Sequence, residues 1–372
     1  MRTRYLELSP YNLVRIILGE RRDSDNESDN VYTRAAAHLT EWITSGALAR
    51  DAEPGIYPYF QEFTVPDTGA RLVRKGFIAL GRIEEYSANI VHRHEQTLSG
   101  PKKDRMEVLR HTHAHFGQIF MLYPDPAGEI DQLLDAAAAV PPLAEIADEF
   151  GATHRLWKIA GAERIQQLMA DKKLLIADGH HRYETALQFR NQNPGLPGAD
   201  RVMMTFVNMY SPGLKILATH RVVSGIDAGN FPHGLAGFDV DAIPSLDALR
   251  DAWERSPGAT VIGAAIGPDL YQLTARGPGG ELDVKVLHER LLSGALGISE
   301  DAVRDEKHIH YVRGIDAAVE EVRSGKAQIA FLLKPTSIQQ VADTSFGGGV
   351  MPQKSTDFYP KLLSGLTIYK LG

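Results

Sequence analysis

The most chemically informative run of the sequence is Asp178-Gly179-His180-His181-Arg182. Four apolar residues, LLIA, precede it and a stretch with helical periodicity follows, so a strand–turn–helix junction is predicted here. The first turn of a helix has unpaired N–H groups and a partial positive charge, which stabilise a bound phosphate. Two imidazoles and a guanidinium add directed donors at the same point. The pattern therefore favours phosphoryl transfer, in which positioning and charge neutralisation carry the catalysis.

Two interpretations of the role of Asp178 at this junction remain open. At the end of a strand its carboxylate could hold Mg²⁺ or orient a neighbouring histidine. The alternative is that Asp178 only caps the helix, with the histidines and the arginine solvated. Two adjacent histidines at a helix start point in different directions, which counts against a zinc site that uses both.

A kinase also needs a base or an orienting carboxylate for its hydroxyl substrate. Glu95, in the run HRHEQT, is the first candidate. The two histidines and the arginine of this run are expected to keep its carboxylate ionised. The alternative is a surface charge cluster. Three basic residues that follow a Ser-Gly-Pro turn are candidates to face phosphate, or are simply solvated: Lys102, Lys103 and Arg105.

A second run, MPQKSTDFYPK at residues 351–361, follows three glycines at 347–349. Lys354 beside Ser355 and Thr356 combines a point charge with hydroxyls, as a P-loop does, but the spacing GxxxxGK[ST] is absent. We therefore expect only that these three residues approach a phosphate or the substrate. The alternative is an ordered C-terminal loop whose Phe358 and Tyr359 fill the core, and both can hold at once.

A third run, HTHAH at 111–115, alternates as a strand does and would place its three histidines on one face. Alternation also suits metal ligation. No carboxylate is paired with the set nearby, so zinc is disfavoured.

The elements around these residues predict an α/β or α+β fold with mixed sheets. Residues 56–83 are predicted to form a hairpin, because two runs rich in aromatic and β-branched residues flank PDTG. Strands and helices then alternate to the end of the chain. We expect an N-terminal region, 1–223, with the catalytic unit, and a C-terminal α/β region, 224–372, whose loop 347–361 returns to the site.

Composition excludes several classes of function. The chain has 372 residues, 43% of them hydrophobic, which suffices for a sizeable core. Because it has no cysteine, disulfides, thiolate metal sites and cysteine nucleophiles are excluded. A net charge of −7 makes nucleic acid an improbable main partner. The start has no signal-peptide pattern and no run is long enough to span a membrane, so a cytoplasmic location is expected.

The run ADGHHRYETAL resembles the signature of the domain-of-unknown-function 1015 family, which often carries a helix-turn-helix label. Further segments match it, and the resemblance covers nearly the whole chain: 92–110, 141–159, 202–223, 282–292 and 351–366. Relatives usually carry several tens of residues before the stretch that matches SPYNLVRI, which here begins at Ser9. If a catalytic group lies in that upstream segment, this chain is expected to fold but to be inactive.

The strand–DGHHR–helix element is also similar to that of the ParB/sulfiredoxin superfamily, which includes free serine kinases. The resemblance implies that residues 178–182 frame the phosphates of ATP or ADP together with Mg²⁺. Sulfiredoxin places its reactive cysteine where this chain has His180, so thiol chemistry is excluded. ParB proteins clamp DNA, and an acidic chain is a poor match for that role.

We therefore expect a kinase that transfers a phosphoryl group to a small hydroxylated metabolite, with free L-serine as the first candidate. The expected catalytic residues are Glu95, Asp178 and His181, with Asp178 also the Mg²⁺ ligand. The expected phosphate or nucleotide contacts are Gly179, His180, Arg182, Lys354, Ser355 and Thr356. The alternatives are a ParB-like nucleotide-binding regulator, which would dimerise, a helix-turn-helix DNA-binding protein, and an inactive homologue. A homodimer is compatible with the kinase as well.

Overall fold

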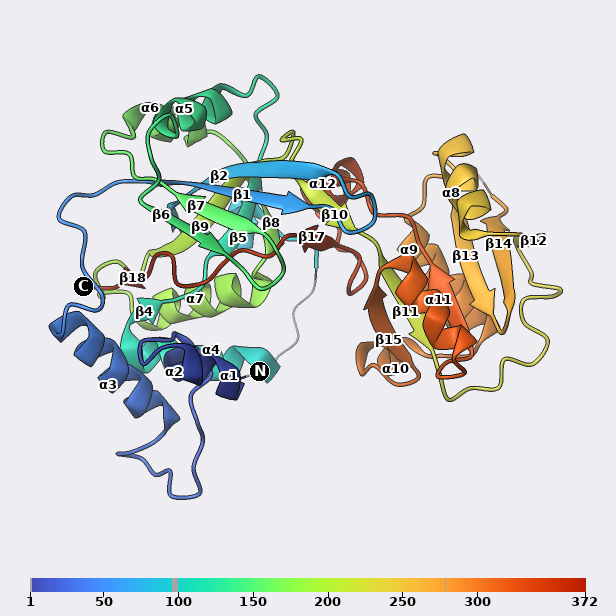
Figure 1. Cartoon of the computed structure of the whole chain (residues 1–372), viewed down its shortest axis with the longest axis horizontal. Helices are drawn as coiled ribbons and strands as arrows, with labels where there is room; N and C mark the ends of the chain where they lie inside the picture. The colour runs from blue at the N-terminus through green and yellow to red at the C-terminus, as the bar shows by residue number, and fades with distance from the viewer. Residues whose placement is uncertain (1, 96–99, 278) are drawn as a thin grey trace.

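The computed structural model describes residues 2–95, 100–277 and 279–372, with the side chains of residues 100 and 101 left out. Two β-sheets lie side by side, and the chain passes from the larger to the smaller and back again (Figure 1). The prediction of a mixed α/β fold is confirmed, although only the large sheet mixes parallel and antiparallel strands.

The large sheet has eight strands and mixed direction. Its strands, in spatial order, are β3 (Val91–His92), β8 (Leu174–Asp178), β5 (Ile119–Tyr123), β9 (Arg201–Asn208), β2 (Arg71–Arg82), β1 (Tyr57–Thr64), β7 (Thr153–Leu156) and β6 (Ala144–Ala147). The β3–β8 and β5–β9 pairs are parallel, and the other pairs are antiparallel. Every residue of β5 is buried, as expected for an apolar strand covered on both faces.

The second sheet has six strands that are all antiparallel to their neighbours. Its order is β12 (Phe238–Ile243), β14 (Asp269–Ala275), β13 (Val261–Ile266), β16 (Ile329–Leu332), β11 (Thr219–Val223) and β15 (Ile309–Arg313). Separate apolar clusters fill its two faces.

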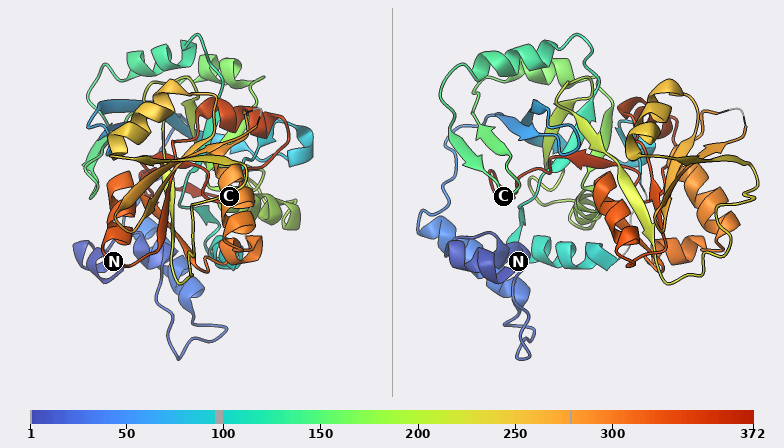
Figure 2. Two further views of the ribbon diagram at one scale, coloured as in Figure 1. Left: turned by 90° about the vertical axis from the view of Figure 1, so that its right-hand side faces the viewer. Right: turned by 45° about the vertical axis from the view of Figure 1, so that its right-hand side comes forward.

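The helices cover both sheets. On one side of the large sheet lie α5 (Glu129–Ala137) and α6 (Glu163–Met169), and on the other lie the N-terminal helices, as Figure 2 shows from two further directions. Those N-terminal helices are α1 (Arg2–Leu8), α2 (Val14–Ile17), α3 (Val31–Thr44) and α4 (Gly100–Thr112), and α7 (His180–Gln192), from the middle of the chain, packs against α4 on the same side. A 3₁₀ turn, η1 (Tyr86–Ala88), precedes β3. The remaining helical segments are α8 (Leu246–Arg255), α9 (Asp283–Val286), the π-helical η2 (Leu287–Ala295), α10 (Glu300–Arg304), α11 (Ile315–Arg323) and α12 (Ile338–Phe346).

The predicted hairpin is confirmed, because β1 and β2 pair antiparallel from Tyr57 with Ile78 to Thr64 with Arg71. The predicted strand at 111–115 is wrong in its first half. Helix α4 continues through His111 to Thr112, and only Ala114–His115 forms a strand, β4. His113 has a φ of 46°, a left-handed conformation that breaks any strand pairing there.

The C-terminal segment leaves the second sheet and runs back along the large one. Strand β17 (Asp357–Tyr359) pairs with β10 (Lys215–Leu217), and β18 (Tyr369–Lys370) pairs with β4. In Figure 1 this segment is the dark red chain that crosses from one sheet to the other. Residues 351–361 therefore lie where the two sheets meet.

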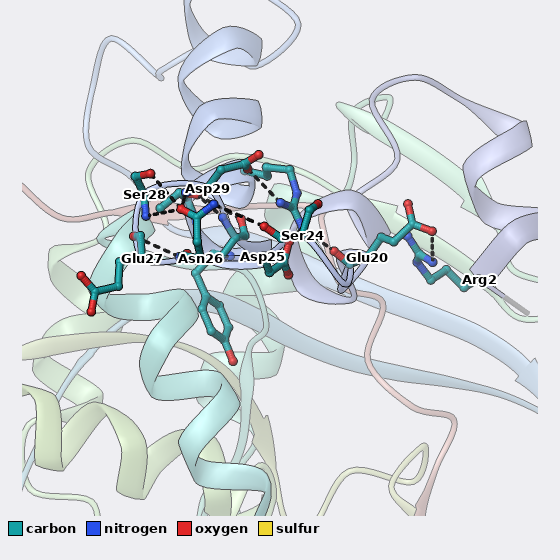
Figure 3. A network of polar contacts seen from close by, with 12 residues as sticks. Arg2, Glu20, Ser24, Asp25, Asn26, Glu27, Ser28 and Asp29 are labelled. Atoms are coloured by element: carbon teal, nitrogen blue, oxygen red, sulfur yellow. Dashed lines mark hydrogen bonds and ion pairs between the residues drawn. The ribbon is translucent and has the colours of Figure 1, made fainter.

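The polar loop before α3 is ordered by its own side chains, as Figure 3 shows. The carboxamide oxygen of Asn26 accepts hydrogen bonds from the Ser28 and Asp29 amides at 2.9 and 3.0 Å. Asn30 then caps α3 by accepting from the amides of Tyr32 and Thr33. Within the described ranges, no helix has the length and apolar character needed to cross a bilayer.

Candidate active site

The predicted strand–turn–helix junction is formed by β8 and α7. Leu175, Ile176 and Ala177 of β8 are buried, and the chain turns at Gly179, whose φ is 98°. Only glycine adopts this conformation without strain. A Cβ at position 179 would also lie 2.9 Å from Nη2 of Arg182. The glycine therefore permits both the turn and the return of the Arg182 side chain across it.

Arg182 folds back onto Asp178, with Nη2 and Oδ2 2.9 Å apart. Burial acts to raise the pKa of Asp178, but Arg182 and then Lys361 outweigh it and hold that pKa below its ordinary value. Asp178 is therefore a carboxylate at neutral pH. This carboxylate is already paired with Arg182, and Asp178 is the last residue of β8.

His180 turns inward rather than toward solvent. It is 6% exposed, and its ring packs edge-on against that of His94, with centroids 4.7 Å apart. His94 Nδ1 lies 2.8 Å from the carbonyl oxygen of Ile176, which can only accept, so Nδ1 carries the proton. His94 Nε2 then accepts from the Thr356 hydroxyl at 2.8 Å.

The two imidazoles are neutral at physiological pH. Burial lowers the pKa of His94 to about 4 and that of His180 to about 3. His180 Nε2 is buried and has no hydrogen-bond partner among the residues that the structure describes. It is thus available to a bound group, and its expected contact with phosphate stays a proposal.

His181 faces α4, where other cations gather. Burial lowers its pKa, and Arg105 and Lys102 lower it further. Burial and the charge of Arg182 likewise lower the pKa of Arg105. The N-terminus of α7 is thus surrounded by positive side chains, as a phosphate site requires.

A pocket of about 750 Å³ opens beside this group of cations. Both Lys102 and Arg93 contribute to its wall and contact Glu184 of α7, with Arg93 Nη1 3.6 Å from Oε1. The guanidinium of Arg93 also lies over the ring of Tyr86, 5.0 Å from its centroid. The pocket extends along α7 past Leu187, Gln188, Asn191 and Gln192.

Glu95 is placed against the C-terminal loop by a bridge between its backbone and that of Met351. The Lys354 amide donates to its carboxylate. The sequence predicts that the adjacent histidines and arginine keep Glu95 ionised, and this explanation is wrong. Arg93 contacts Glu184 instead, and His94 is neutral. Burial raises the pKa of Glu95, Lys354 lowers it, and Asp178 raises it again.

The structure separates the three residues of the Lys-Ser-Thr run. Lys354 lowers the pKa of Glu95 and Thr356 donates to His94, so the structure brings both of them to the other candidate residues. Ser355 does not face it. Its hydroxyl donates to the Pro352 carbonyl, and the residue lines a small cavity beside the second sheet.

Sequence reasoning missed the role of three residues. His94 links β8, α7 and the C-terminal loop, and its signal was only its place in the run HRHE. Lys361, the last residue of the run 351–361, lowers the pKa of both Asp178 and Glu95, but it was not predicted to act at the site. Arg221 is buried and donates hydrogen bonds to the carbonyls of Gln353 and Lys354 in the C-terminal loop. No sequence motif around Arg221 indicates this contact.

In the described part of the chain, no three or more His, Asp or Glu side chains lie together in a way that could hold a metal ion by themselves. Mg²⁺ commonly needs only one or two carboxylates when a phosphate supplies the other oxygens. Asp178 raises the pKa of Glu95 electrostatically and lies just before the first turn of α7, so these two carboxylates fit that second arrangement.

Comparisons with known proteins give one family and several distant folds. The profile of the family described as "Protein of unknown function (DUF1015)" matches residues 1–284. No curated protein matches the chain. Among solved structures, a free serine kinase variant in complex with ADP is 14% identical, with 76% of this chain and 87% of that chain covered and a TM-score of 0.41.

Two other structures have similar values. A conserved hypothetical protein from Pyrococcus furiosus is 16% identical, with coverage of 76% and 90% and a TM-score of 0.39. C-terminally truncated SbnI from Staphylococcus aureus is 10% identical, with coverage of 77% and 85% and a TM-score of 0.38.

Proposed function

The chain belongs to the family described as "Protein of unknown function (DUF1015)", and from its site we propose that it is a nucleotide-dependent phosphotransferase with a small hydroxylated acceptor. The observation that carries the proposal is the arrangement around α7. The N-terminus of α7 brings His181 close to Lys102 and Arg105, and Asp178, just before it, acts electrostatically on Glu95, which also has Lys354 beside it. The group of cations suits phosphates, and Glu95 with Lys354 suits a hydroxyl acceptor.

The phosphates of ATP or ADP would bind at the start of α7, where the backbone N–H groups and Arg182 supply donors. His180 Nε2 and His181 Nδ1 are buried without partners among the described residues, and both would gain one from phosphate oxygens. Mg²⁺ would be held by Asp178 together with nucleotide oxygens, and it would neutralise charge on the transferring group.

The acceptor would enter between the phosphates and Glu95. Its hydroxyl oxygen forms a bond to the terminal phosphorus as the bond from that phosphorus to the nucleotide's bridging oxygen breaks. The hydroxyl proton passes to the carboxylate of Glu95, whose raised pKa makes it a better base than an ordinary glutamate. Lys354 stabilises the negative charge around the reacting oxygens.

Free L-serine is the acceptor that the sequence resemblance implies. It combines a primary hydroxyl with a carboxylate, and the exposed ammonium groups of Lys354 and Lys361 suit that carboxylate.

The test incubates the purified chain with Mg²⁺, ATP or ADP, and a series of hydroxylated metabolites that includes L-serine, with mass-spectrometric detection of the phosphorylated product. Nucleotide without acceptor serves as the hydrolysis control. We expect acceptor-dependent product that is lost in Glu95→Gln. Nucleotide binding or hydrolysis that no acceptor changes would instead favour the ParB-like regulator.

A further inference from the structure

Arg221 lies in β11 of the second sheet and is 1% exposed. Its guanidinium donates to the carbonyl oxygens of Gln353 and Lys354, at 3.1 and 3.0 Å, and to that of Thr219 in its own strand. It therefore joins the second sheet to the loop that supplies Lys354.

Burial of this cation is expensive and is only partly compensated. No ion pair of Arg221 with a carboxylate occurs in the described ranges, and burial lowers its pKa to about 10. A cation–π contact offsets part of this desolvation cost, since the ring centroid of Tyr311 lies 5.3 Å from the guanidinium carbon. An apolar residue of similar volume would fill the same space at lower cost. The guanidinium differs from such a residue in its hydrogen bonds, so its role is sought in them.

Those hydrogen bonds reach the residues that face the site. The same loop donates the Met351 amide to the His94 carbonyl at 2.7 Å and the Thr356 hydroxyl to His94 Nε2. Between these points the Lys354 amide donates to Glu95. Lys354 has a φ of 57°, a conformation that costs free energy for a residue with a side chain. The carbonyls held by Arg221 and the amide held by Glu95 fix this strained residue from both sides.

A second buried arginine holds the other end of the segment. Arg74 of β2 is 1% exposed and donates to the carbonyls of Tyr359, at 3.2 Å, and Pro360. The segment from Gln353 to Pro360 is therefore fixed at one end by each sheet.

The geometry points to Arg221 as a positioning residue, which holds Lys354 and Thr356 in place against Glu95 and His94. In this view the second sheet is a platform that sets the geometry of a site located on the large sheet. The catalytic consequence rests on the proposed function, whereas the anchoring itself does not.

The test compares Arg221→Met, which keeps the volume but has no donor, with Arg221→Lys, which keeps the charge but not the planar fork. Arg276→Met is the matched control, because Arg276 directly follows β14 of the same second sheet and pairs with Asp239 at the surface. In Arg221→Met we expect kcat to fall about 100-fold, because small displacements of catalytic groups have effects of that size. The KM for nucleotide should stay within about 2-fold, since α7 binds the phosphates. Arg221→Lys should fall in between, and Arg276→Met should match the wild type.

Hydrogen–deuterium exchange of the same variants tests the anchor without any assay of activity. Amides in 351–357 should exchange about 10-fold faster in Arg221→Met, as loss of two hydrogen bonds implies, while those in α7 stay unchanged. Unchanged exchange in 351–357, or a parallel loss of nucleotide affinity and kcat, overturns the inference. If the wild-type chain transfers no phosphoryl group, the proposed function fails, and the exchange rates alone then decide the anchor. If Arg221→Met does not fold, the same comparisons are made with Arg221→Lys.

Discussion

His94 and His180 meet edge-on with their ring centroids 4.7 Å apart, although 85 residues separate them in the chain. One ring comes from the segment just after β3 and the other from the first turn of α7. Because the Thr356 hydroxyl binds Nε2 of His94, this contact ties the N-terminal end of α7 to the C-terminal loop. The pair is thus a structural link between the two halves of the proposed site.

The buried histidines predict a loss of stability in acid. In the folded chain the pKa values of His94 and His180 are about 4 and about 3, below the ordinary value of 6.5 that applies when unfolded. Below pH 6.5 the unfolded chain therefore binds more protons, so the free energy of unfolding should decrease as pH falls toward 4. Each such group contributes up to about 1.4 kcal/mol per pH unit in this window. Urea unfolding at several pH values measures the slope, and His180→Asn should flatten it; an unchanged slope in that variant would contradict the assignment.

Asp178→Ala should abolish turnover with little effect on the fold. The ion pair with Arg182 is partly exposed on both sides, so its loss should change the free energy of unfolding by no more than about 1 kcal/mol. Under the proposed function, turnover would be lost because no carboxylate would remain at the end of β8 to hold Mg²⁺. Steady-state kinetics and chemical denaturation check the two halves of this prediction, and normal turnover in the variant would reject the role of Asp178.

Gly179→Ala should damage both the turn and the position of Arg182. A residue with a side chain in the left-handed region costs about 1–2 kcal/mol, and the new Cβ would crowd the Arg182 guanidinium. Gly195→Ala is the control, because a Cβ there meets nothing within 4 Å and its φ is ordinary. Thermal unfolding and nucleotide titration of both variants measure the effect. Equal behaviour of the two would show that the turn tolerates a side chain.

Lys354→Met should move the acid limb of the pH–rate profile. Lys354 lowers the pKa of Glu95 against the effect of burial, so its removal raises that pKa further. Glu95 must be deprotonated to act as a base, and activity should therefore begin to fall at a higher pH than in the wild type. The profile of kcat/KM from pH 4.5 to 8 records the shift. A shift toward lower pH would mean that Glu95 is not the group that titrates.

Lys102→Met should weaken nucleotide binding about 10-fold, as expected for one charge-assisted contact to phosphate. Lys103→Met is the matched control from the next position of α4, since Lys102 borders the pocket and acts on His181 while Lys103 is an exposed side chain. Calorimetric titration with ATP and with inorganic pyrophosphate compares the variants. Equal losses in both would indicate only a general effect of net charge.

The sequence by itself determined the local chemistry of this protein. An apolar run, an Asp-Gly turn and a helical stretch are each set by neighbouring residues, so β8, Gly179 and α7 could be predicted, as could the β1–β2 hairpin. The same local reasoning failed at 111–115, where an alternating pattern lies partly in a helix, because packing of α4 against α3 and α7 outweighs a short periodicity.

Only the tertiary structure decided which distant groups share the site. Glu95 meets Met351, Arg221 meets Lys354, and Arg74 meets Tyr359, across separations that no local pattern reports. Burial then reset their chemistry, since it raised the pKa of Glu95 and made the histidine pair neutral, whereas the charges adjacent in sequence suggested the opposite for Glu95. The physical reason is that desolvation depends on everything packed around a group, and that surrounding is assembled from both sheets and the returning C-terminal chain.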